Sequence, residues 1–212
     1  MKQRVPVWIV NIACMAQNAK GTPVDLALSR QTYRIIRPSD YTKGRPMISV
    51  DYVRRMARYN RWQNENLYET ASRLADEERR REREAFFGSI HRTLSHLMWA
   101  DRLWMSRFCG TQRPQGAISE SASLYPDWDL LRSQRVGFDA EIMRWAEDLS
   151  PDWLAGELTY FSQSSARDIR WSRWMLVSHF FNHQTHHRGQ VHCMLTQAGM
   201  KPQDTDLTVM PG

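Results

Sequence analysis

From Met47 onward, inward-facing positions recur in alternating steps of four and three residues, and this rhythm is the strongest constraint on the fold. An α-helix has about 3.6 residues per turn, so such steps place every member of the series on one helix face. Ser49 and Asp51 are candidate N-caps at the start of the stretch. The sequence therefore predicts an amphipathic helix over residues 48–75. Its inward face consists of Val53, Ala57, Asn60, Asn64, Leu67, Ala71 and Leu74.

Two members of that face, Asn60 and Asn64, are polar. A buried amide needs hydrogen-bond partners, so one interpretation is that both asparagines face a polar cavity inside the protein. The other interpretation is that they lie at the edge of the apolar face, in water. The sequence leaves both open.

The same rhythm predicts three further helices, over residues 84–108, 127–149 and 172–198. Gly110 and Gly199 follow the first and the last of these and are suited to terminate them. Residues 157–171 break the pattern with two short β-favouring pieces, which indicates a small hairpin or an extended loop. Four long helices in one body predict an all-α fold, a four-helix bundle over residues 47–212.

Residues 1–46 show no sustained helical or strand period. They are interpreted as an unstructured N-terminal extension, and Met47 is then a candidate for the true start of the native protein. The alternative is a weak secretory signal in PVWIVNIACMA, whose apolar run is broken by Asn11.

Charge and cysteine usage exclude several classes of function. The formal net charge of +6 is carried by residues 1–46, which hold eight basic and two acidic residues and leave 21 of each in the body. A neutral body argues against nucleic-acid binding. No stretch reaches the roughly 18 apolar residues that a membrane span requires. The three cysteines form no CxxC pair, which favours a reducing cytoplasm over a disulfide framework or a zinc ribbon.

Five of the seven histidines lie within residues 179–192, in HFFNHQTHHRGQVH. In a helix, His183 and His187 are one turn apart and occupy two inward positions. Two such imidazoles need a third ligand, and His96 in the second predicted helix can supply it across the core. Three neutral imidazoles with an open fourth position are typical of catalytic zinc. The alternative is a pair of buried neutral histidines satisfied by their neighbours.

The other four histidines are not expected to be metal ligands. His179 shares the face of His183 but sits one turn earlier, so it is interpreted as a core residue or one that supports a ligand. His186 lies roughly 100° around the helix from His187, which suits contact with a ligand or a substrate better than coordination. His91 and His192 are expected to have no part in the site. HEXXH is absent, so a metalloprotease has no motif support.

Three segments resemble the DinB-like (damage-inducible) metalloprotein superfamily: YNRWQNENLYE, SIHRTLSHLMWADRLWMSRF and FNHQTHHRGQVHCMLTQAG. The resemblance covers about residues 47–208. It implies a four-helix bundle of up-down-down-up topology, commonly dimeric, with a divalent metal held by three histidines. The matching positions here are His96, His183 and His187. Nothing before Met47 corresponds to the superfamily.

The resemblance also implies a class of activity, since relatives include thiol-dependent transferases and a maleylpyruvate isomerase that uses a low-molecular-weight thiol. The expected function is therefore transfer or isomerisation with such a thiol as partner of an electrophilic substrate. Zinc is the expected metal, and nickel or ferrous iron also suits the donor set. Alternatives are a metal-dependent hydrolase with Asp101 as its base, or a non-catalytic metal-binding stress-response protein. A homodimer is expected from the resemblance and because the body holds eight tryptophans, more than one modest core readily buries.

Overall fold

The structure is a computed structural model that describes residues 46–163 and 165–211. The predicted extension, up to Arg45, lies outside the described residues. The four long helices are α1 (Val50–Ser72), α3 (Ile90–Cys109), α4 (Trp128–Asp148) and α6 (Arg173–Gln197). The shorter elements are α2 (Asp76–Arg80), η2 (Ser121–Ser123), α5 (Pro151–Ala155), β1 (Glu157–Ser162), β2 (Arg167–Ser172) and η3 (Leu207–Val209).

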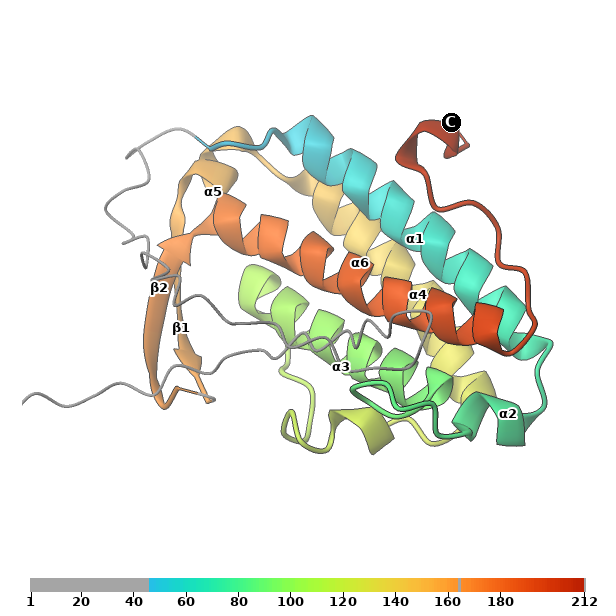
Figure 1. Ribbon diagram of the computed structural model, residues 1–212. Coiled ribbons are helices and arrows are strands. Elements are labelled where there is room, and N and C mark those ends of the chain that lie inside the picture. The colour runs from blue at the N-terminus through green and yellow to red at the C-terminus, as the bar shows by residue number, and fades with distance from the viewer. Residues whose placement is uncertain (1–45, 164, 212) are drawn as a thin grey trace, which may run out of the picture. The chain divides into compact units, whose positions relative to one another are not determined.

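The long helices pack side by side in two pairs of opposite direction. In Figure 1 the colours show that α1 and α6 run one way and that α3 and α4 run the other way. Helix α1 packs against α4 and α6, and α3 packs against the same two helices. β1 and β2 form an antiparallel hairpin, with Glu157 opposite Ser172, directly before α6. The prediction of a mostly helical fold with a small hairpin before the last helix is thus confirmed.

Most helix ends follow the predicted signals. The Ser49 side chain accepts a hydrogen bond from the Tyr52 backbone N–H at 3.1 Å, and Gly110 ends α3 with a φ of 68°. The expected start at Glu84 was wrong. Helix α3 begins at Ile90 because Ser89 is its N-cap, and a tight turn precedes it in which Gly88 has a φ of 81°. Helix α1 ends at Ser72, three residues before the expected end.

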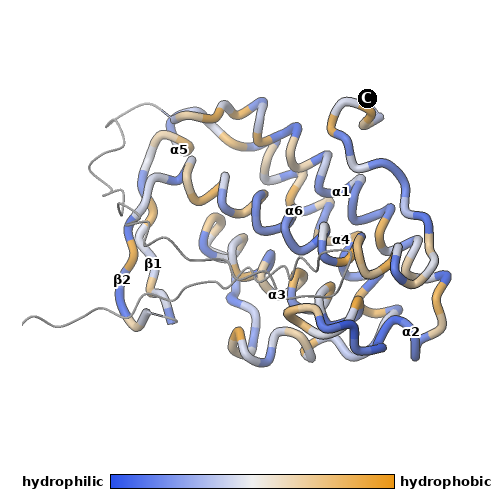
Figure 2. Tube along the Cα trace, in the orientation of Figure 1, coloured by the Kyte–Doolittle hydropathy of each residue, from blue (hydrophilic) through white to orange (hydrophobic). Residues whose placement is uncertain are grey.

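The interior between the long helices is largely apolar. Hydrophobic and hydrophilic positions alternate along each helix in Figure 2, as expected for helices with one buried face. The largest fully buried side chains come from all four long helices and from α5, among them Leu67, Leu94, Ile142, Leu154 and Phe180.

A buried polar network crosses this interior. Asn60 and Asn64 of α1 are both fully buried and donate to the Asp139 carboxylate of α4 at 2.8 and 3.0 Å. Arg135 bridges Asp139, at 2.7 Å, and Asp101 of α3, at 2.8 Å. Arg188 of α6 hydrogen-bonds Asn60. The two asparagines therefore face a polar interior and do not lie at the edge of the helix face.

Candidate metal centre

Three histidines converge where α3 packs against α6. His183 and His187 lie one turn apart on α6, and His96 faces them from α3. Each offers a ring nitrogen, and these nitrogens all lie within 4.8 Å of one another. The ring centroids are 4.4 Å apart for His183 and His187, and 4.8 Å for His96 and His187. The structure thus brings together the three residues that the sequence singles out.

A serine sets the tautomer of His96. The Ser121 hydroxyl donates to the Ile118 carbonyl at 2.6 Å, so its oxygen is left to accept the Nδ1–H of His96 at 2.8 Å. The proton on Nδ1 leaves a lone pair on the Nε2 atom of His96. That is the form in which an imidazole binds a metal.

A glutamine holds His187 in the same way. The Gln190 side-chain carbonyl oxygen lies 2.8 Å from Nδ1 of His187 and accepts its proton. The Nε2 of His187 then points at the Nε2 of His183, 3.1 Å away. Two nitrogens on one tetrahedral zinc lie about 3.3 Å apart, given a Zn–N bond of about 2.0–2.1 Å. Because Nε2 of His187 then carries no proton, Nε2 of His183 is the donor in this contact when no metal is bound. Metal binding would require that proton to move to Nδ1 of His183, which is buried and has no hydrogen-bond partner among the described residues.

Burial keeps all three rings neutral. It lowers the pKa of His96 to about 3, that of His183 to about 2 and that of His187 to about 4. Repulsion from the neighbouring imidazoles adds to this for His96 and His183. Near neutral pH a cation therefore does not compete with the protonation of these imidazoles to their charged form. In donor type, spacing and protonation, the residues fit a divalent metal.

Phe87 covers one side of the cluster. Its ring stacks on His96 with centroids 3.9 Å apart and lies 5.5 Å from the ring of His187. The sequence placed Phe87 in a helix, whereas the structure places it in the turn before α3. An apolar cover of this kind limits access of water and strengthens electrostatic interactions at the site.

The remaining histidines fall into distinct positions. His186 is exposed, and the Gln190 amide nitrogen lies 3.3 Å from its Nε2, so Gln190 links His186 to His187. His179 contacts the rings of His183 and Trp104. His91 is buried on α3 outside the cluster, and its Nε2 lies 2.7 Å from the Tyr125 carbonyl oxygen.

Asp101 is not part of the histidine cluster. It is fully buried and paired with Arg135 in the interior network. Burial raises its pKa to about 6, although Arg135 opposes that shift. Its carboxylate is thus engaged with an arginine and not directed at the three imidazoles.

The cluster opens onto a pocket of about 290 Å³. His96 and His183 form part of its wall, together with aromatic residues of α3 and with Tyr160 of the hairpin. This pocket gives a small molecule access to the nitrogens of the site. The hairpin, which sequence analysis left without a role, thereby becomes one wall of the site.

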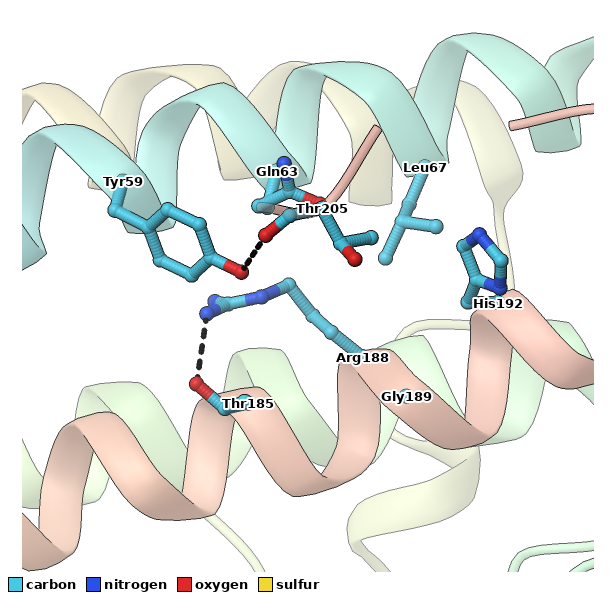
Figure 3. Close-up of a pocket in the computed structure, with 8 residues that line it drawn as sticks. All are labelled: Tyr59, Gln63, Leu67, Thr185, Arg188, Gly189, His192 and Thr205. Carbon is cyan, nitrogen blue, oxygen red and sulfur yellow. Dashed lines mark hydrogen bonds between the residues drawn. The ribbon is translucent and has the colours of Figure 1, made fainter. Parts of the chain in front are cut away.

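A second hollow, of about 190 Å³, lies between α1, α6 and the C-terminal segment (Figure 3). Arg188 extends across it and donates to the Thr185 hydroxyl at 3.3 Å, and the Tyr59 hydroxyl donates to the Thr205 carbonyl at 2.7 Å. None of the three clustered histidines lines this hollow. It is separate from the candidate metal centre.

Comparison with known proteins identifies the family of the chain. Residues 47–211 match the DinB family. The chain belongs to the DinB family. Protein DinB of Bacillus subtilis (strain 168) is 26% identical over 168 residues, covering 74% of this chain and 91% of that protein.

A solved structure shares the DinB fold. The crystal structure of a DinB-like protein from Bacillus cereus ATCC 10987 superposes with a TM-score of 0.51 at 17% identity, covering 68% of this chain and 90% of the other. The matched family segment nearly coincides with the domain predicted from the helical rhythm. None of the described helices is long and apolar enough to cross a membrane.

Proposed function

We propose that this DinB-family chain binds one divalent cation, zinc in first place, through His96, His183 and His187. The observation that carries the proposal is the convergence of three neutral imidazole nitrogens from two helices. Ser121 and Gln190 support it by fixing two of the three tautomers. Nickel and ferrous iron accept the same donors.

We further propose that the site serves a transferase or isomerase that uses a low-molecular-weight thiol. A bound divalent cation would lower the pKa of such a thiol and favour its thiolate. The pocket lined by His96 and His183 would hold the electrophile beside it and limit its contact with water. In a transfer, the sulfur lone pair forms a bond to the electrophilic carbon, and the leaving group departs with its bonding electrons.

The thiol is assigned to a cosubstrate because the described cysteines lie elsewhere. Cys109 and Cys193 are exposed, and neither belongs to the histidine cluster. Partial desolvation of the Cys109 sulfur and the nearby charge of Glu141 also raise the pKa of this thiol, so less of it is present as the nucleophilic thiolate. A thiol from solution can reach the histidines through the pocket.

Two other functions have less support. A metal-dependent hydrolase needs a base beside the bound water, and its candidate, Asp101, is paired with Arg135. A non-catalytic metal-binding stress-response protein would need no pocket at the site, whereas one of about 290 Å³ opens there. Absence of turnover with every thiol tested, despite full metal content, would favour the non-catalytic metal-binding protein.

The test combines metal analysis with a screen. Elemental analysis should find about one zinc per chain in the wild type, and strongly lowered content in His96→Ala, His183→Ala and His187→Ala. His192→Ala, on the same helix as two of them, is the matched control and should keep its metal. The metal-loaded protein is then screened with thiols against electrophiles. Full metal content in both His183→Ala and His187→Ala would refute the assigned ligands.

Four further proposals concern the helix topology, the location, the oligomeric state and the binding partners of the chain. We propose that the four long helices form the up-down-down-up bundle of the family, that the chain is a cytoplasmic homodimer, and that it binds neither nucleic acid nor membrane. The antiparallel pairs of helices in Figure 1 support the first of these. Light scattering at micromolar concentration tests the dimer.

A further inference from the structure

The pocket beside the histidines is lined by two kinds of polar side chain. His96 and His183 belong to the candidate metal centre. The others include two arginines, Arg107 from the last turn of α3 and Arg113 from the loop that follows. Among the described residues that line it, none is Asp or Glu. The pocket therefore has positive charge and no acidic side chain of its own to balance it.

Arg107 lies against two aromatic rings that contact each other edge to face, with centroids 5.5 Å apart. The carbon at the centre of its guanidinium group lies 4.5 Å from the Trp104 ring centroid and 4.1 Å from that of Tyr160. These ring contacts leave guanidinium N–H groups able to donate to a ligand. Within the described part of the chain, no carboxylate forms an ion pair with Arg107.

The electrostatics of the pocket also favour a bound anion. Burial lowers the pKa of Arg107 against a smaller opposing effect of Tyr160, and the charge of Arg113 lowers this pKa further. Burial and the charge of Arg113 both disfavour the arginine cation in the absence of an anion. A bound carboxylate would offset both, and its two oxygens match the planar fork of a guanidinium group.

A continuous line of aromatic and imidazole rings joins Arg107 to His183. The Trp104 ring, on which Arg107 stacks, lies 5.0 Å from the His179 ring, and His179 lies 5.9 Å from His183. A molecule anchored at Arg107 would therefore extend along Trp104 and His179 toward the convergent nitrogens. His179 is accordingly a wall residue of the pocket.

We propose that this pocket binds a small organic carboxylate, whose acid group pairs with Arg107 and Arg113 and whose carbon skeleton lies along Trp104 toward His183. A volume of about 290 Å³ is at the small end of ligand sites, which suits an acid of few carbons. The inference deepens the proposed function by naming the chemistry of one reactant. The carboxylate can belong to the electrophile or to the thiol.

The test is direct binding of benzoate to the full-length protein, measured by calorimetry without added metal and again with zinc. Benzoate combines a carboxylate with a flat ring, and benzamide is its neutral counterpart. We expect benzoate to bind and benzamide to bind much more weakly. Arg107→Gln and Arg113→Gln should each weaken benzoate about tenfold, as expected for loss of a hydrogen-bonded charge pair. Added salt should weaken it too.

The matched control is Arg55→Gln, which removes the same charge from an exposed position of α1 outside the pocket. Its affinity for benzoate should equal that of the wild type. Arg113 is exposed, so Arg113→Gln tests the proposal even if Arg107→Gln unfolds. No benzoate binding, or equal affinity in Arg113→Gln and the wild type, would overturn the proposal. Equal affinity for benzamide would overturn it as well.

Competition in the zinc-loaded protein identifies the reactant that carries the acid. If mercaptoacetate displaces benzoate and 2-mercaptoethanol does not, the carboxylate belongs to the thiol. If benzoate stays bound with either thiol present, it belongs to the electrophile. Displacement by both thiols would place benzoate on the metal and overturn the arginine assignment. Because the first test needs no metal, benzoate binding without thiol-dependent turnover would refute the proposed function alone.

Discussion

Nδ1 of His96 lies 2.8 Å from the hydroxyl oxygen of Ser121, which itself donates to a backbone carbonyl. The loop after α3 thus decides which nitrogen of His96 faces the other two histidines. A serine 25 residues away in sequence thus belongs to the candidate metal centre without being one of its three histidines. Such partners orient a ligand ring and raise its basicity.

Replacing Ser121 by Ala should therefore weaken zinc binding although all three ligands remain. We expect a loss of about 10-fold to 100-fold in zinc affinity, measured by competition with a chromogenic chelator. Ser123→Ala is the control, since Ser123 lies in the same short helix but is exposed and bonds only the Glu120 carbonyl. Equal zinc affinity in Ser121→Ala and Ser123→Ala would show that the serine does not support His96.

His186 is expected to affect turnover more than metal content. It is exposed, its ring lies 5.0 Å from that of His187, and it is hydrogen-bonded to Gln190, which also holds His187. His186→Ala should keep about one zinc per chain and lower any thiol-dependent kcat by roughly tenfold. His192→Ala, also on α6, should change neither quantity. A loss of zinc as large as that in His183→Ala would instead make His186 a ligand.

The helical rhythm predicted the elements well because burial of one helix face is a local property of the sequence. It placed α4 within one residue at each end, over Asp127–Leu149 against Trp128–Asp148. It failed before α3, where Phe87 keeps the rhythm but a left-handed Gly88 and the N-cap Ser89 interrupt the helix. Helical spacing in the sequence cannot distinguish a residue within a helix from a residue in the preceding turn that packs against the end of that helix.

The site was predictable only where its residues share a helix or show a matching pattern. His183 and His187 follow from spacing alone, and Gln190 comes three residues after His187, close to one helical turn further on. Ser121 and Arg113 come from the loop after α3, and Tyr160 from the hairpin. Their positions depend on how these segments fold back onto α3, which no periodicity encodes. Arg107 carried no signal, because its role arises from the rings of Trp104 and Tyr160 around it.

Acid should destabilise the metal-free protein through the same histidines. In the folded chain the pKa of His96 is about 3 and that of His187 about 4, whereas an unfolded histidine titrates near about 6.5. As the pH falls below about 6.5, the unfolded state takes up these protons first, so the free energy of unfolding decreases until the folded-state values are reached.

Calorimetry should show a Tm several degrees lower at about pH 5 than at about pH 7 for the metal-free protein. A variant with Gln at His96, His183 and His187 is the comparison, because it keeps every carboxylate that also titrates in acid. Its Tm should fall less over the same interval. An equal fall in both proteins would mean that the three imidazoles are not held neutral by burial.

Arg135 should be the most costly single charge to remove. It is buried and pairs with Asp101 and Asp139, so its loss leaves two carboxylates without their cation. Removing one partner from a buried ion pair costs about 3–5 kcal/mol, since the remaining charge stays out of water. Arg135→Gln should lower the free energy of unfolding by that amount in urea.

Arg132→Gln is the matched control, one turn earlier on α4 but exposed, and should change the free energy of unfolding by no more than about 0.5 kcal/mol. Arg135 lies at the centre of a network that joins side chains of all four long helices. Its other members are Asn60 of α1, Asp101 of α3, Asp139 of α4 and Arg188 of α6. Apolar surfaces tolerate small shifts of one helix along another, whereas these paired groups do so only at the cost of unpaired charge. A loss below about 1 kcal/mol in Arg135→Gln would contradict this, because it would mean that water or a rearranged side chain replaces the guanidinium group.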